Sequence, residues 1–169
     1  MMLRKAKPED AEAIGLVRVS AWRAAYRQFM PQAFLDALNP DANIEELKER
    51  LANQSEEFTV FVAERERSVV AFAIVGEPRY RAPARTLELW AVNVLPECWR
   101  MGIGSALVER VLQYSAGAGV ERLELWCLKG NRPALEAYRK LGFVESGQER
   151  STSQLTGHVL HELHYVKMI

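Results

Sequence analysis

The segment "CWRMGIGSAL", residues 98–107, carries two glycines, Gly102 and Gly104, between an arginine and an amphipathic helical pattern. A strand is predicted to end near Val94, and a helix is predicted to begin around the glycines. The first N–H groups of a helix have no partner within it and lie at the positive end of its dipole. Glycines let an anion approach such a backbone closely. This loop could therefore bind a phosphate. The alternative is an ordinary turn between strand and helix, in which the glycines only allow the chain to bend.

Two known phosphate-binding motifs do not match this loop. A P-loop requires Gly-Lys-Ser/Thr, whereas Gly104 is followed by Ser105 and Ala106. A dinucleotide-binding fingerprint requires a third small residue where Leu107 stands, and its glycines should follow the strand directly. We therefore expect neither an NTPase nor a dinucleotide-binding fold.

A second group of residues lies one helix and one strand further along the chain. The segment "NRPALEAYRKLGF" predicts a helix with Asn131 as its N-cap and Gly142 past its end, and this helix carries Ala134 and Tyr138. Ala134 and Tyr138 are four residues apart and share one helix face. Together, residues 87–112 and 121–147 resemble the GNAT superfamily of N-acetyltransferases. Its signatures are Gln/Arg-x-x-Gly-x-Gly/Ala and Asn-x-x-Ala-x-x-x-Tyr followed by Leu-Gly-Phe, and the second one matches in full.

The first signature departs from the family at one position. Trp99 stands where the family has glutamine or arginine, and Arg100 supplies a positive charge from the next position. Because backbone N–H groups provide much of the expected phosphate binding, we expect the cofactor site to be retained. The departure leaves open which side chain assists.

The resemblance implies that acetyl-CoA is the acetyl donor. The pyrophosphate would lie on the backbone N–H groups of Arg100, Met101, Gly102, Ile103, Gly104, Ser105 and Ala106. The pantetheine amides would pair with the exposed strand edge at Val92, Asn93 and Val94, because in this family that strand diverges from its neighbour and leaves a V-shaped cleft. Asn131 would contact the pantetheine, Ala134 would leave room for it, and Tyr138 would lie near the thioester sulfur.

Acetyl transfer to an amine needs a base for the amine, a hydrogen-bond donor for the oxyanion and a proton for the leaving thiolate. The resemblance implies the N–H of Val92 as the oxyanion donor and Tyr138 as the general acid; the alternative for Tyr138 is a core aromatic residue. Glu88 is the candidate base, since it lies in the otherwise apolar segment "LELWAVNV", where some family members, among them histone acetyltransferases, carry a glutamate. The alternatives for Glu88 are a solvent-facing residue and a salt-bridge partner of a nearby arginine.

The residues on the acceptor side are less well defined. In this family the acceptor pocket is built from the first helices, the strand ends and the last hairpin. Tyr26, Phe29 and Met30 of "SAWRAAYRQFMP", together with Trp90, are therefore candidate substrate-binding residues. The alternative is that these apolar side chains fill the core.

Three histidines, His158, His161 and His164, lie close together near the C-terminal end of the sequence. Side chains alternate along a strand, so His161 would point away from the other two. We therefore expect no metal site here, although one histidine could line the acceptor site.

Hydrophobic periodicity and turn residues predict the elements that position these residues. Strands are expected at residues 2–6, 58–64, 68–77, 85–94, 121–128, 143–150 and 158–169. Helices are expected at 8–26, 43–54, from the glycine loop to about Gly117, and at 131–142. Residues 28–41 are broken by Pro31 and Pro40, so they are expected to be irregular or a short helix.

The order β-α-α-β-β-β-α-β-α-β-β predicts one α/β domain over residues 1–169. We expect a mixed, mostly antiparallel sheet of about seven strands with about four helices on its faces. The resemblance adds that this GNAT-like sheet is splayed at its centre.

The composition excludes several kinds of partner. The net charge of the 169 residues is zero, and no basic patch indicates nucleic-acid binding. No apolar stretch approaches the roughly 20 residues that span a membrane, and "MMLRKAKPED" lacks the apolar core of a signal peptide. Cys98 and Cys127 lack metal-ligand spacing and are expected to be free thiols, so we expect a cytoplasmic protein. The apolar terminus "HYVKMI" permits the homodimers that many family members form.

Three functions are consistent with these features. The first is an N-acetyltransferase that acts on an amino-acid-like or metabolite amine by direct attack in a ternary complex. The second is a protein N-terminal or lysine acetyltransferase, which would need an open groove for an extended peptide, so a long ordered closing hairpin would argue against it. The third is an acyl-CoA-binding sensor without turnover.

Overall fold

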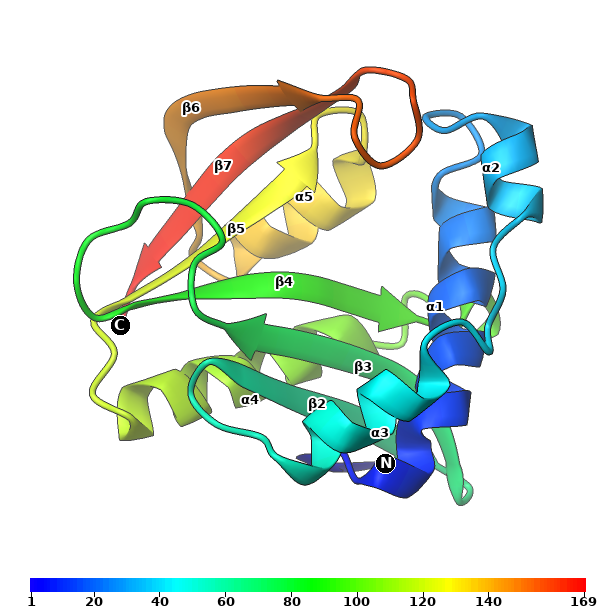
Figure 1. The fold of residues 1–169 in the computed structure, drawn as a ribbon. Coiled ribbons are helices and arrows are strands. Elements are labelled where there is room, and N and C mark those ends of the chain that lie inside the picture. Colours follow the sequence, from blue (N-terminus) through cyan, green and yellow to red (C-terminus); the bar gives the residue numbers. More distant parts are fainter.

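All seven strands join one sheet, in the order β1-β2-β3-β4-β5-β7-β6, in a computed structural model that describes residues 1–169 (Figure 1). Neighbouring strands are antiparallel except for β4 and β5, which are parallel. The strands are β1 (Met2–Lys5), β2 (Phe58–Arg65), β3 (Ser68–Gly76), β4 (Thr86–Val94), β5 (Arg122–Leu128), β6 (Val144–Thr152) and β7 (Leu160–Met168). The predicted mixed, mostly antiparallel sheet is confirmed.

Five α-helices accompany the sheet, one more than predicted. They are α1 (Ala11–Ala25), α2 (Gln32–Asp36), α3 (Ile44–Ala52), α4 (Ile103–Gly117) and α5 (Arg132–Lys140), with 3₁₀ turns at Pro8–Asp10 and Pro96–Cys98. The additional helix, α2, lies in the segment expected to be irregular or a short helix. It begins directly after Pro31, whose missing N–H and fixed φ are compatible with the start of a helix.

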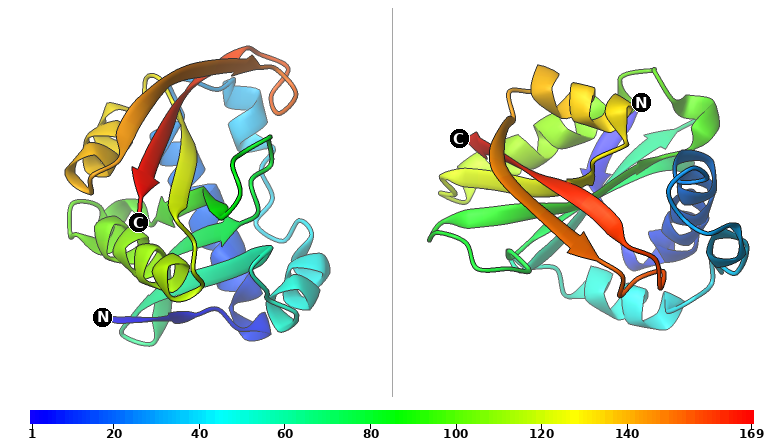
Figure 2. Two further views of the ribbon diagram at one scale, coloured as in Figure 1. Left: turned by 90° about the vertical axis from the view of Figure 1, so that its left-hand side faces the viewer. Right: turned by 90° about the horizontal axis from the view of Figure 1, so that it is seen from above.

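Helices cover both faces of the sheet (Figure 2). On one face, α1 and α3 pack against β2 and β3 through a cluster that includes Ile14, Val17, Leu51 and Phe72. On the other face, α4 and α5 pack against the central strands through a larger cluster. Alternating strand residues supply the two clusters, which is why β2 and β3 read as continuous apolar runs. A third, small cluster joins α2 to the ends of β5 and β7.

The strands β4 and β5 pair over only three residues each and then separate. The paired residues are Thr86–Glu88 and Arg122–Glu124, whereas β5 pairs with β7 along its whole length. Figure 1 shows β5 leaving β4 toward the top of the view, with β7 and β6 on the far side of β5 from β4. We call the diverging residues 89–94 of β4 and 125–128 of β5 the fork. The splay that the resemblance implied is confirmed.

A β-bulge lies in β4 just beyond the point of divergence. Val75 pairs with Leu89 and Ile74 pairs with Ala91, so Trp90 is the extra residue. A bulge bends its strand and increases the local twist. It therefore turns β4 where β5 leaves it, a feature that the sequence pattern does not signal.

Two further predictions can be compared with the structure. Cys98 and Cys127 are both free and buried, as expected. None of the helices is both long enough and apolar enough to cross a membrane.

Candidate active site

The edge of β4 that faces the fork offers unpaired backbone groups. The N–H of Leu95 donates to a β3 carbonyl at 2.9 Å. Because backbone groups alternate sides along a strand, those of Asn93 also face β3, and those of Val92 and Val94 face the fork. The Val94 carbonyl accepts a hydrogen bond from the Trp99 indole Nε1 at 2.8 Å. The N–H of Val94 and both backbone groups of Val92 therefore remain free for a ligand.

The loop before α4 and the first turn of α4 together present six consecutive N–H groups without an acceptor in the protein, those of residues 100–105. Arg100 and Gly102 have φ values of 62° and 78°, which turn the chain into the helix. A Cβ added at Gly104 would meet only Val94 Cγ2, at 3.6 Å, and Val92 Cγ1, at 3.9 Å, so the space above this backbone is open. Six free donors at the positive end of a 15-residue helix fit an anionic group such as a diphosphate.

Helix α5 begins on the opposite side of the fork. Its N-cap is Asn131, whose Oδ1 accepts from the N–H of Ala134 at 3.4 Å, as predicted from the sequence. Gly142 follows the helix with a φ of 86°. The side-chain amide nitrogen of Asn131 remains free, because only the oxygen is used in the cap.

Tyr138 of α5 is half-buried, and its ring packs edge-on against Phe143 at 5.8 Å between centroids. Its hydroxyl makes no hydrogen bond within the protein. Burial raises the pKa of Tyr138 above its ordinary value of 10, and the neighbouring Cys127 and Tyr26 raise it further. The hydroxyl therefore remains protonated at neutral pH and can donate a proton.

Glu88 lies at the last paired position of β4 and is completely buried. The side chain of Arg79, from the loop between β3 and β4, donates to Oε1 from Nε at 3.0 Å and from Nη2 at 2.5 Å. The backbone N–H of Arg79 donates to Oε2 at 2.7 Å. Both carboxylate oxygens are therefore occupied, which matches the alternative interpretation of Glu88 as the partner of an arginine.

Glu124 is the register partner of Glu88 across the two strands and is 3% exposed. Its Oε2 accepts from Nη2 of Arg122 at 3.2 Å and lies 3.3 Å from Nε2 of His164. The other nitrogen of His164, Nδ1, lies 2.8 Å from the hydroxyl of Ser146. Burial lowers the pKa of His164, against the opposing influence of Glu124.

Comparison with known proteins identifies the chain. Residues 10–143 match the acetyltransferase (GNAT) family. The chain is 31% identical over 138 residues to the uncharacterized N-acetyltransferase YuaI of Bacillus subtilis, a match that covers 81% of this chain and 76% of the relative. It belongs to the GNAT acetyltransferase family. It is therefore an acetyl-CoA-dependent acyltransferase, and the alternative of a sensor without turnover is not supported.

Two further relatives of this GNAT acetyltransferase are informative. It is 28% identical over 159 residues to the putative phosphinothricin acetyltransferase YwnH of Bacillus subtilis, covering 93% of this chain and 92% of the relative. Its fold matches that of the PaiA N-acetyltransferase from Thermoplasma acidophilum in complex with coenzyme A. That match has a TM-score of 0.78 with 17% identity and covers 99% and 98% of the two chains. At this identity the second match shows the shared fold.

The donor side of the GNAT acetyltransferase differs from the sequence-based expectation at two residues. Ala106 was expected among the phosphate-binding N–H donors, but its N–H donates to the Gly102 carbonyl at 3.0 Å as the first bond of α4. That expectation is wrong, and the free donors end at Ser105. Asn93 directs its backbone groups to β3, so the strand geometry favours Val92 and Val94 for pairing with the pantetheine.

Trp99, the departure from the family signature, has a structural role in this acetyltransferase. Its ring is 43% exposed, and its indole ties the loop to the end of β4 through Val94. A glutamine or arginine side chain at this position could instead reach toward a ligand. The side chain of Trp99 therefore stabilises the loop, and the backbone supplies the free donors.

Of the predicted acceptor residues, Met30 is buried in the core between α2 and the sheet. It is 7% exposed and lies in one cluster with Leu35 and Leu160. Phe29 is half-buried against this cluster, and a Cβ added at Gly130 would lie 2.2 Å from the Phe29 ring. The alternative interpretation of a core side chain describes Met30, whereas Phe29 remains a predicted acceptor residue.

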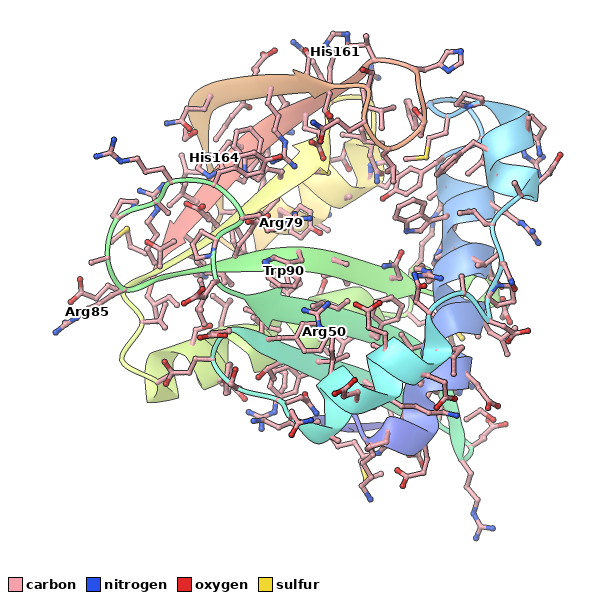
Figure 3. All side chains as sticks on the ribbon, in the orientation of Figure 1. Arg50, Arg79, Arg85, Trp90, His161 and His164 are labelled. Atoms are coloured by element: carbon pink, nitrogen blue, oxygen red, sulfur yellow. The ribbon has the colours of Figure 1, made fainter.

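Tyr26 and Trp90 have different surroundings. Tyr26 packs edge-on against Trp22, and its pKa is raised to about 12 by burial and by Cys127. Trp90 lines a groove of about 590 Å³ together with Arg50 and Arg79, whose guanidinium carbons lie 5.8 and 5.6 Å from its ring. Figure 3 shows these two arginines and Trp90 gathered on the face of the sheet that α3 covers.

Neither Arg79 nor Glu124 stands out as a site residue in the sequence, and His164 stands out only as one of three histidines of which one could line the acceptor site. One signal was available, because "LELW" occurs twice, at residues 87–90 and 123–126, and so places Glu88 and Glu124 at equivalent positions. The contacts of Arg79 and His164 depend on loop and strand placement that no local pattern encodes. No three histidine, cysteine or acidic side chains converge in a way that could hold a metal ion.

Proposed function

We propose that this protein transfers the acetyl group of acetyl-CoA to the primary amine of a small amino-acid-like molecule, by direct attack in a ternary complex. The closing hairpin, formed by β6 and β7, is the observation that favours a small acceptor. Strands β6 and β7 are nine residues each. Leu160, at the start of β7, packs with Leu35 of α2 and with Met30. The hairpin is thus held against the α1–α2 segment, where an extended peptide would need an open groove.

The relatives support the same choice. The match to the putative phosphinothricin acetyltransferase spans almost all of both chains. The name of that relative refers to a small amino-acid-like acceptor. The aromatic and arginine side chains around Trp90 suit an acceptor of this size.

The donor would bind along α4 and β4. The free N–H groups of residues 100–105 would bind the pyrophosphate, and those of Val92 and Val94 would pair with the pantetheine amides. The side-chain nitrogen of Asn131 would bind the pantetheine from the other side of the fork, where Ala134 has no bulk to obstruct it. When bound, acetyl-CoA supplies the activated acetyl group.

The chain itself would supply two of the three chemical requirements through Val92 and Tyr138. The N–H of Val92 would donate to the acetyl oxygen as negative charge develops there. Tyr138 would donate its proton to the leaving thiolate, a contribution that is typically about 10²- to 10⁴-fold in rate. The third requirement is a base. Glu88 would meet it only if Arg79 moved aside.

The test is an assay of CoA release. The purified protein is mixed with acetyl-CoA and a pool of amines, amino acids and peptides, the free thiol is followed, and the acetylated product is identified by mass. We expect an acetylated small amine. Acetylated peptides alone would favour the protein acetyltransferase, and the absence of CoA binding in calorimetry would contradict the assignment of the loop.

A further inference from the structure

Two carboxylates stand side by side where the fork begins. Glu88 and Glu124 occupy the same position in the two "LELW" segments and are direct partners in the parallel register. Directly opposed residues of neighbouring strands point to the same face of a sheet. Both side chains therefore lie at the base of the fork, and the N–H of Val92, which would bind the acetyl oxygen in the proposed function, lies four residues further along β4.

The two carboxylates differ in which oxygen atoms are free. The oxygens of Glu88 accept three hydrogen bonds from Arg79, and none of the side chain is exposed. Oε1 of Glu124 accepts no hydrogen bond, and it is not among the side-chain atoms sealed from solvent. About a twentieth of that side chain remains exposed, at 5%. Glu124 alone of the pair has a carboxylate oxygen that accepts no hydrogen bond within the protein.

The rest of the Glu124 carboxylate is held in place. Arg122 donates a hydrogen bond to Oε2 and His164 lies beside the same oxygen, whereas Oε1 accepts no hydrogen bond. His164 is fixed in turn by Ser146 and by the ring of Trp126, whose centroid lies 4.6 Å away. A carboxylate fixed through one oxygen and free at the other has the geometry of a general base.

We propose that Glu124 is the general base of acetyl transfer, an inference that rests on the proposed function. The neutral amine attacks the thioester carbon and passes an N–H proton to Oε1 of Glu124 as the C–N bond forms. The C–S bond breaks, and the thiolate takes the hydroxyl proton of Tyr138. The proton on Glu124 then restores Tyr138 through solvent, so the protein ends each turnover unchanged.

The groups that face Glu124 come from three strands. Arg122 lies on its own strand, His164 on β7, and Glu88 on β4 with Arg79 behind it. The carboxylate of Glu124 thus faces one arginine directly and a second charge pair across the register.

The test is the rate of acetyl transfer by Glu124→Gln against pH, with the amine identified by the release assay. We expect kcat to fall about 100-fold or more at pH 7, since general base catalysis typically contributes 10²–10⁴. The Kd for CoA should stay within twofold. The deficit should shrink as the pH is raised, because hydroxide then takes the proton; lost packing would give no such change. Glu121→Gln, at an exposed glutamate paired with Arg85, is the matched control with unchanged kcat.

The outcomes separate this inference from the proposed function. If Glu124→Gln transfers at the normal rate, or if Glu88→Gln alone shows the pH-dependent deficit, Glu124 is not the base and the acetyltransferase assignment stands. If the wild-type protein acetylates no amine, both fall. If thermal melts show that Glu124→Gln does not fold, Glu124→Asp is the variant that tests the inference. Its shorter carboxylate should lower kcat in the same pH-dependent way. A normal kcat for Glu124→Asp would overturn the inference.

Discussion

The ion pair between Arg79 and Glu88 provides a quantitative test of the fold around the site. Arg79→Ala removes the two side-chain donors to a carboxylate that has no other side-chain partner and no exposure to solvent. Stranding a buried charge typically costs about 3–5 kcal/mol. The Arg79 side chain is 46% exposed, and its backbone N–H bond to Glu88 remains in the variant. Solvent screening therefore reduces our estimate to about 2–3 kcal/mol.

Such a loss is measurable by thermal and urea denaturation. For a chain of this length, we expect the Tm of Arg79→Ala to fall by about 4–12 °C. Arg81→Ala, an exposed position in the same loop with no ion pair, is the control and should leave the Tm within about 1 °C. In a Glu88→Gln background, Arg79→Ala should cost less, because no charge is then stranded. An equal cost in both backgrounds would refute the reasoning.

Three other perturbations are expected to have specific effects. Tyr138→Phe should lower kcat about 10²-fold or more without changing the Kd for CoA, measured by steady-state kinetics and calorimetry; unchanged kcat would exclude the acid role. Because burial lowers the pKa of His164 below 6.5, its contribution to stability is complete above pH 6.5 and is lost as the pH falls through the folded-state pKa. His164→Gln should flatten that slope in urea titrations, and the exposed His161→Gln should not. Gly15→Ala should destabilise the fold by about 1–3 kcal/mol, because its Cβ would lie 2.1 Å from the Pro40 carbonyl oxygen; a normal Tm would contradict that packing.

The parts of the site that depend on local signals could be predicted from the sequence. Asn131 caps its helix and Gly142 ends it, because cap preferences act over a few residues. The loop before α4 was recognised from two glycines and the start of an apolar helical pattern. That the free N–H donors end at Ser105 could not be predicted, because the hydrogen bond from Ala106 to Gly102 depends on how the chain turns into the helix.

The parts that depend on contacts between distant elements could not be predicted. Glu88 reads as an isolated charge in an apolar strand, and only the path of the preceding loop brings Arg79 onto it. Met30 reads equally well as a pocket residue and as a core residue, and its burial depends on where α2 meets β7. The bulge at Trp90 arises from the pairing with β3, which a single strand cannot reveal.

The short pairing of β4 with β5 has a consequence for how the protein avoids aggregation. An unpaired strand at the margin of a sheet is a template for any other polypeptide and promotes fibrils. Here the unpaired edge of β4 lies inside the sheet, with β3 on one side and β5 diverging on the other. A second protein strand would need room for its side chains between β4 and β5, whereas a narrow ligand chain with amide groups has no such side chains and could bind there. The fork thus keeps a strand edge available for recognition while shielding it from unwanted self-association.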